Sequence, residues 1–158
     1  MMDSNDNKCG SCTMCCKIMA VSQLQKPKNQ WCEHCYIGTG CRIYQDRPSS
    51  CQSFRCLWLQ SQDHFPPLPL NLRPDKCKVV LHTSADEKNI IAKTDPKYPN
   101  AWKEKGIGLM LGTIAEKCYV LVDTGSQYWM LKDGKARPAK MTAADADGNE
   151  TFLGYMDE

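Results

Sequence analysis

The sequence carries little excess charge and no long hydrophobic run. Its 158 residues include 20 Lys or Arg side chains and 18 Asp or Glu side chains, for a net charge of +2. A balance so close to neutral gives no electrostatic reason to expect a nucleic-acid partner or an anionic membrane surface. The most apolar stretch, Gly106 to Ala115, is far shorter than the roughly 20 residues of a membrane span, so we predict no membrane partner.

A secretion signal is also missing from the first residues. The start, MMDSNDNK, is polar and acidic, whereas a secretory signal has a basic segment followed by an apolar one. We therefore expect a cytoplasmic protein. Because thioredoxin and glutathione keep cytoplasmic thiols reduced, the 11 cysteines are more useful there as metal ligands than as a disulfide framework.

Most of the cysteines lie between residues 9 and 56, in a region with few Ile, Val and Phe side chains. Such a region of about fifty residues cannot readily bury enough apolar surface to fold unaided. Metal coordination would supply the missing stability, because binding energy becomes folding energy when the site exists only in the folded chain. The candidate metal ligands are Cys9, Cys12, Cys15, Cys16, Cys32, Cys35, Cys41, Cys51 and Cys56.

The first four of these cysteines have the closest spacing. Cys9, Cys12 and Cys15 form C-x-x-C-x-x-C, and Cys16 follows directly. C-x-x-C is the shortest loop that lets two thiolates meet on one tetrahedral ion, and the overlapped form is also used by iron–sulfur clusters. On a helix the four positions would share one face. The spacing leaves the cofactor open between zinc and iron, the latter as an iron–sulfur cluster.

The other candidate ligands follow in two groups. Cys32 and Cys35 form a second C-x-x-C, and Cys41 follows two glycines whose flexible backbone suits a tight turn. Further on, Pro48 is well placed to open a helix that carries Cys51 and Trp58 on its inner face. Disulfides, redox thiols and simple core packing are the alternatives to ligation, and the density of the cysteines favours ligation.

Some neighbouring residues have two interpretations. Arg42, Arg47 and Arg55 lie among the candidate ligands, where guanidinium groups would offset thiolate charge, although solvated surface arginines are the alternative. Cys77 and Cys118 lie outside the cluster at predicted strand starts, so we expect them to pack in the core.

Beyond the cluster the pattern changes to that of a small α+β module. The β-branched segments 77–83 and 89–95 predict one hairpin, and segments 118–125 and 127–134 predict a second. Between them, apolar residues at a 3.6-residue spacing predict a helix with Pro99 in its first turn, although three glycines weaken it. No catalytic residue and no organic cofactor site is predicted.

The domain organisation follows from these changes in composition. We predict a cysteine-rich metal-binding region at 1–62, a proline-rich segment at 63–76 that runs extended, and an α+β module at 77–158. The expected fold class is α+β, with a metal-stapled region of short helices and loops packed on the module, either as separate parts or as one compact domain.

The cysteine motifs also resemble those of a known family. CGSCTMCC is followed in order by WCEHC, GCRIY, DRP and CQSFRCLWL, and the set resembles bacterial zinc- or iron-chelating CxxCxxCC proteins over Cys9 to Leu59. LRPDK, further along, also resembles that family's continuation. One branch of that family is similar to flagellin lysine methylase, an enzyme. The resemblance implies metal ligation by all the candidate cysteines except Cys35, which matches no expected thiol.

Three functions compete at this point. The first is a metal-binding scaffold, store or carrier, which needs no catalytic base. The second is an iron–sulfur enzyme related to flagellin lysine methylase, in which the cluster keeps an open coordination position. The third is a module that uses zinc as a staple and binds a protein partner through its hairpins.

Overall fold

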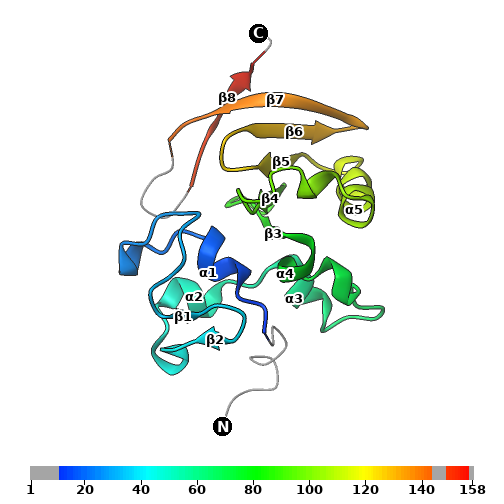
Figure 1. The fold of residues 1–158 in the computed structure, drawn as a ribbon. Coiled ribbons are helices and arrows are strands. Elements are labelled where there is room, and N and C mark those ends of the chain that lie inside the picture. Colours follow the sequence, from blue (N-terminus) through cyan, green and yellow to red (C-terminus); the bar gives the residue numbers. More distant parts are fainter. Residues whose placement is uncertain (1–10, 144–148, 157–158) are drawn as a thin grey trace.

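The structure is a computed structural model that describes residues 11–143 and 149–156. Its main feature is a six-stranded sheet whose strands lie in sequence order, β3-β4-β5-β6-β7-β8 (Figure 1). Neighbouring strands are antiparallel except for the parallel pair β4 and β5. The strands are β3 (Val79–Thr83), β4 (Ile90–Thr94), β5 (Val120–Asp123), β6 (Tyr128–Lys132), β7 (Lys135–Met141) and β8 (Phe152–Tyr155).

Both predicted hairpins are confirmed, and the protein is a mixed α+β fold. β3 pairs with β4, and β5 pairs with β6, in the antiparallel register that two hairpins require. The prediction did not include the last two strands of the sheet. The turn at Asp133 and Gly134 leads into β7, which forms a third hairpin with β6, and β8 then pairs with β7. The second half is therefore one continuous sheet rather than two separate hairpins.

Parallel strands cannot be joined by a tight turn, and the β4–β5 connection accordingly contains helices. A 3-10 turn at Ala101–Lys103 is followed by α5 at Lys105–Ala115. The prediction of Pro99 in the first turn of the helix is wrong. Glu104, with an extended backbone at φ −60° and ψ 148°, separates the 3-10 turn from α5 and moves the start of the helix beyond the proline.

Three glycines lie within α5 without interrupting it. A Cβ atom on Gly106 would lie 3.4 Å from the side-chain Nδ2 of Asn71, and one on Gly108 would lie 3.3 Å from the carbonyl oxygen of Lys103. A Cβ on Gly112 would meet nothing within 4 Å. Glycine costs about 1 kcal/mol relative to alanine inside a helix, so Gly112 carries that cost with no neighbouring atom to require it.

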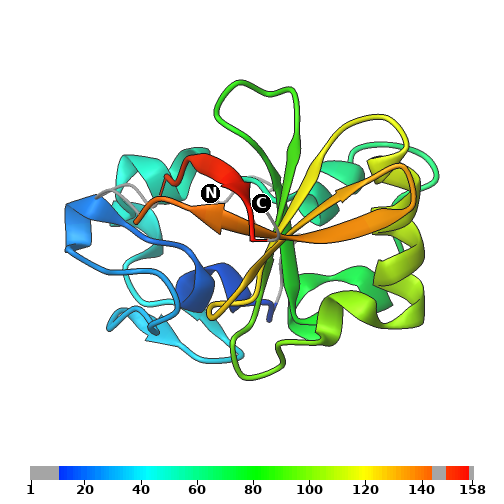
Figure 2. The same cartoon turned by 90° about the horizontal axis from the view of Figure 1, so that it is seen from above.

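The two faces of the sheet bury different clusters. Because successive strand residues point to opposite faces, Val79 and Leu81 pack with Ile107 and Leu111 of α5, whereas Val80 packs with the cysteine-rich region. Viewed along the stack of strands, α5 and the cysteine-rich region lie on opposite sides (Figure 2). The second cluster is the smaller one and consists of Met14, Ile18, Cys56, Trp58, Leu59 and Val80.

The described part of the cysteine-rich region, residues 11–62, forms only short elements. They are α1 (Met14–Ile18), a 3-10 turn (Ser22–Leu24), β1 (Cys35–Tyr36), β2 (Gly40–Cys41), a 3-10 turn (Tyr44–Asp46), α2 (Ser49–Ser53) and α3 (Leu57–Ser61). A helix through the first four cysteines would include Cys9 and Cys12. Cys12 precedes α1, and Cys9 lies outside the described residues.

The prediction of one helix running from Pro48 to Trp58 is also wrong in its length. Pro48 does precede α2, but the backbone of Phe54 is extended and ends that helix. A new helix, α3, starts after Cys56, whose sulfur accepts the Leu59 N–H at 3.5 Å as an N-terminal cap. Cys51 and Trp58 therefore belong to different helices.

The proline-rich segment is less extended than predicted. It contains a 3-10 turn at Leu70–Leu72 and α4 at Pro74–Cys77, with Pro74 at the first helical position that proline favours. The Trp58 indole Nε1–H donates to the carbonyl oxygen of Pro69 at 3.0 Å, and Leu72 contacts both apolar clusters. The segment thus covers the junction between the sheet and the cysteine-rich region.

Ion pairs also join the two parts. Lys17 of α1 contacts the Asp95 carboxylate at 2.6 Å, and Lys28 contacts Asp123 at 3.1 Å. Both carboxylates are buried at the ends of β4 and β5. Among the described residues, no helix combines the length and apolar character needed to cross a membrane.

Candidate metal centre

Backbone hydrogen bonds bring the two C-x-x-C segments together. The Cys32 N–H donates to the carbonyl oxygen of Cys16 at 2.9 Å, and the Gly38 N–H donates to the side-chain oxygen of Thr13 at 2.9 Å. The β1–β2 hairpin then places Cys35 directly opposite Cys41. Segments separated by about twenty residues in the sequence therefore lie against each other at α1.

Six thiols form one interacting group around Cys16. The Cys16 side chain hydrogen-bonds with the side chains of Cys15 and Cys35, and electrostatic interactions couple it to Cys41 and Cys51. Cys32 interacts electrostatically with Cys35, Cys41 and Cys51. We call this set the thiol group; its members are Cys15, Cys16, Cys32, Cys35, Cys41 and Cys51.

The surroundings of the thiol group favour the protonated form of several members. A hydrogen bond in which the Cys16 thiol donates to Cys15, followed by burial, raises the pKa of Cys16. Burial and the neighbouring Cys16 raise the pKa of Cys35 to about 12. Burial likewise raises the pKa of Cys41 and of Cys51. These thiols are neutral at pH 7, and each would have to release a proton to bind a metal.

A buried lysine lies beside the thiol group. Lys26 is 8% exposed, and its ammonium donates to the carbonyl oxygens of Lys17 and Pro27 at 3.1 Å and to that of Met19. Burial lowers the pKa of this ammonium, and the electrostatic interactions with Cys32, Cys16, Cys15 and Cys51 oppose that shift. When charged, the Lys26 ammonium opposes the rise in the pKa of Cys16.

No motif in the sequence pointed to Lys26. It precedes a proline in a polar turn and belongs to no cysteine motif. Its burial results from the Val21–Lys26 bridge, in which the two residues exchange backbone hydrogen bonds of 2.9 and 3.1 Å. Only the folded turn brings the side chain back toward α1.

Among the three arginines considered from the sequence, Arg47 acts on the thiol group. Its positive charge opposes the rise in pKa of Cys41 and Cys51. The guanidinium is held by the carbonyl oxygen of Tyr44 at 2.9 Å and lies 3.9 Å from the centre of the Tyr44 ring. Arg55 instead pairs with Asp63 at 2.9 Å, in an exposed position.

Two candidate ligands lie apart from the thiol group. Cys12 packs against the smaller apolar cluster. Its side chain also hydrogen-bonds with the Asp75 carboxylate. This hydrogen bond lowers the pKa of Asp75, and the neighbouring Arg73 lowers it more. Cys56 is buried in the same cluster, and burial raises its pKa. Cys9 lies outside the described residues. Their ligand roles stay predictions.

The two cysteines outside the cluster behave differently from the thiol group. Cys77 packs against the larger apolar cluster, and burial raises its pKa to about 11. Its thiol donates to the carbonyl oxygens of Leu72 and Val79, both at 3.4 Å. This placement agrees with the prediction of core packing. Cys118 is half-buried and donates to the carbonyl oxygen of Ile114 at 3.8 Å.

The thiol group suits zinc or iron in kind, because both accept all-thiolate coordination. The described cysteines are all free thiols, so no disulfide competes for these sulfurs in that part of the chain. In position the fit is incomplete: within residues 11–143 and 149–156, no three His, Cys, Asp or Glu side chains are arranged so that they could hold a metal ion.

Comparison with known proteins adds no relative, since no family model, curated protein or solved structure matches the chain. The resemblance to CxxCxxCC proteins therefore stands on its motifs, and the function must be argued from the chain itself.

Proposed function

We propose that the cysteine-rich region binds a thiolate-ligated metal, zinc or iron, and that the protein serves as a metal-binding scaffold, store or carrier. The observation that carries this proposal is the thiol group, in which six sulfurs from four separate segments interact with one another and with the buried Lys26. Convergence of this kind has no role in apolar packing, because most of these sulfurs contribute nothing to either apolar cluster.

Burial along the chain supports the same proposal. From Pro27 to Arg55 no residue is buried. A segment of this length has to be held by something other than apolar contacts if it is to keep one conformation. A metal held by thiolates would cross-link α1, the β1–β2 hairpin and α2 after small movements of the sulfurs, and the positive charges of Lys26 and Arg47 would offset excess negative charge on the ligands.

A second candidate, an iron–sulfur enzyme, is favoured by a polar cleft next to α2. The cleft has a volume of about 520 Å³ and is lined by Ser50, Ser53, Phe54, Arg55, Gln60, His82 and Thr83. Ser50 and Ser53 are close neighbours of Cys51 in α2, so a substrate in this cleft would lie near the proposed centre. A bound cluster would supply redox or Lewis-acid chemistry there.

The test is purification of reduced protein without oxygen, followed by elemental analysis and a visible spectrum. A colourless protein with stoichiometric zinc would support the scaffold, store or carrier. A brown protein with iron and inorganic sulfide would support the enzyme. Protein that neither contains nor takes up either metal would refute the proposal.

Single substitutions locate the centre. Cys16→Ser and Cys51→Ser should each lower the bound metal per chain, because each removes a thiolate from the thiol group. Cys77→Ser is the matched control, since its sulfur packs against the larger apolar cluster, and it should retain the wild-type metal content. Equal metal content in all three variants would contradict the assignment of the ligands.

A further inference from the structure

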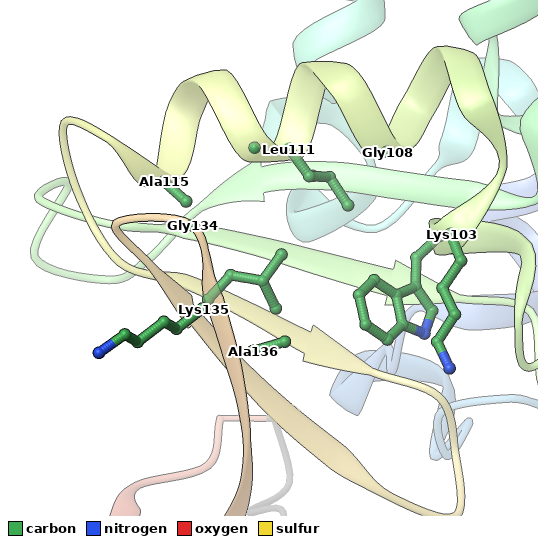
Figure 3. Close-up of a pocket in the computed structure, with 10 residues that line it drawn as sticks. Lys103, Gly108, Leu111, Ala115, Gly134, Lys135 and Ala136 are labelled. Atoms are coloured by element: carbon green, nitrogen blue, oxygen red, sulfur yellow. The ribbon is translucent and has the colours of Figure 1, made fainter.

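A cavity lies between α5 and the β6–β7 hairpin, on the opposite side of the sheet from the thiol group. Its volume is about 180 Å³, and Figure 3 shows Leu111 reaching from the helix toward the hairpin that carries Ala136. The wall is predominantly apolar. It is formed by Trp102, Leu111, Ala115, Leu131 and Ala136, with Gly108 and Gly112 on the helix side.

The cavity accounts for the glycine that packing does not explain. A Cβ atom on Gly112 would meet no atom within 4 Å. A close neighbour therefore does not explain why this residue is glycine. Gly112 instead borders the cavity, and any side chain there would extend into or over that space. An unfavourable helix residue is thus placed where it keeps an apolar space open.

A positive charge lies at the rim. Lys103 lines one end of the cavity (Figure 3). Its ammonium is 5.2 Å from the Trp102 ring centre and 5.7 Å from that of Trp129. Lys135 lines the other end and extends outward. Among the described residues, neither ammonium has a carboxylate within 4.0 Å. An anionic group at the mouth would therefore find an unpaired cation.

We propose that this cavity binds a small carboxylate whose apolar part is one aromatic ring or a short alkyl chain. The size is suitable, since an apolar cavity of roughly 150 Å³ accommodates benzene. The ring would lie between Leu111 and Leu131, and the carboxylate would pair with Lys103 at the rim. This site is separate from the thiol group, so it does not depend on the proposed metal.

The probe for the test is 3-phenylpropanoate, titrated into the complete protein while backbone amide and indole NMR signals are followed. Saturable shifts should be confined to α5, the Trp102 indole and the β6–β7 hairpin. The neutral 3-phenylpropanamide, which has the same ring and chain, should bind at least about fivefold more weakly because it cannot pair with Lys103.

Variants of the same helix separate filling of the cavity from damage to the helix. Gly112→Leu should raise the Kd for 3-phenylpropanoate by at least about tenfold, and Gly112→Ala by about threefold, because each puts side-chain atoms at the cavity. Gly106→Ala is the matched control: it also exchanges glycine for alanine in α5, does not border the cavity, and should leave the Kd unchanged. Lys103→Gln should raise the Kd for the carboxylate and not that for the amide.

Three results would overturn the proposal. They are the absence of saturable shifts at α5 and the hairpin, equal affinity for the carboxylate and the amide, and an unchanged Kd in the Gly112 variants. Should Gly112→Leu fail to fold, Gly112→Ala still decides the question, because alanine favours the helix.

Discussion

The two sides of the sheet achieve order by different means. On the α5 side, Ala92, Leu111, Val120 and Val122 are completely buried, at 0% exposure. On the other side, the long segment from Pro27 to Arg55 contains no buried residue. Its conformation depends on short backbone hydrogen bonds, the β1–β2 hairpin and the polar surroundings of the thiol group.

This difference leaves the two regions with unequal stabilisation by apolar contacts. Removal of apolar surface from water contributes roughly 25 cal/mol per Å², so the α5 side is stabilised by its own side chains. The cysteine-rich region has only the small cluster around Ile18 and Val80 for that purpose. Perturbations should therefore separate the two regions, and the following predictions are ordered from the largest expected effect to the smallest.

Metal removal should have the largest effect, and only on one region. With a chelator and a reductant present, amide hydrogen exchange should accelerate throughout residues 27–55, because thiolate–metal binding contributes on the order of 10 kcal/mol in small zinc domains. The amides of β4 and β5 should keep their protection, since apolar contacts hold them. Equal protection of the amides of residues 27–55 from hydrogen exchange, with and without metal, would show that a metal does not order this region.

Truncation of the apolar core should have the opposite distribution. Ile107 of α5 is buried, with 2% of its surface exposed. Ile107→Ala should therefore lower the free energy of unfolding of the sheet by about 2–5 kcal/mol, while the metal content stays unchanged. Urea unfolding followed by circular dichroism measures this loss. Leu109→Ala, at a position of the same helix that is 67% exposed, is the control and should change stability by less than about 0.5 kcal/mol.

Acid should weaken the sheet through His82. Burial, together with the charge of Lys93, lowers the pKa of this imidazole from 6.5 to about 4, and its Nε2 has no hydrogen-bond partner in the described structure. The folded protein binds this proton less readily than the unfolded chain, so the contribution is present above pH 6.5 and is lost as the pH falls toward 4.

Between pH 7 and pH 5 the loss should be about 2 kcal/mol. The measurement is urea unfolding at both pH values, compared between the wild type and the variants. His82→Gln should remove this part of the pH dependence, whereas His64→Gln, at an exposed position, should keep it. A wild-type pH dependence in His82→Gln would show that the imidazole is not the titrating group.

Loss of the buried ammonium should have the smallest effect. Lys26→Met removes the charge that favours the thiolates, so zinc affinity at pH 7 should fall by about tenfold, or 1.4 kcal/mol. The pH midpoint of zinc binding should move upward, because the thiols then release their protons less readily. Competition with a colorimetric chelator across a pH series measures both. Lys88→Met, an exposed lysine, should leave the curve unchanged.

Much of the α5 side could be predicted from local patterns. The β-branched segments gave both hairpins, and the apolar spacing gave the helix, because burial on one face leaves a periodic signal in the sequence. β7 and β8 were not predicted, since their exposed residues leave little apolar signal and their pairing bulges between Lys140 and Met141. The glycines of α5 are unfavourable in a helix by their intrinsic propensity. No local pattern in the sequence indicates the cavity beside Gly112.

The cysteine-rich region was predictable in composition and less so in geometry. The spacing singled out nine candidate sulfurs, but it could not separate Cys12 and Cys56, which pack on the apolar cluster, from the thiol group. The family resemblance left out Cys35, which the β1–β2 hairpin places opposite Cys41 and within hydrogen-bond reach of Cys16. Contacts between distant segments decide such assignments, and spacing reports only near neighbours.

The sequence by itself determined strands β3 to β6, the crossover helix and the concentration of thiols in one poorly apolar region, because each depends on residues that are close together in the chain. Only the tertiary structure decided which sulfurs face one another, that Lys26 is buried beside them, and that a cavity remains at Gly112. Those features arise where segments far apart in sequence meet, and there distance and burial, rather than local preference, set the chemistry.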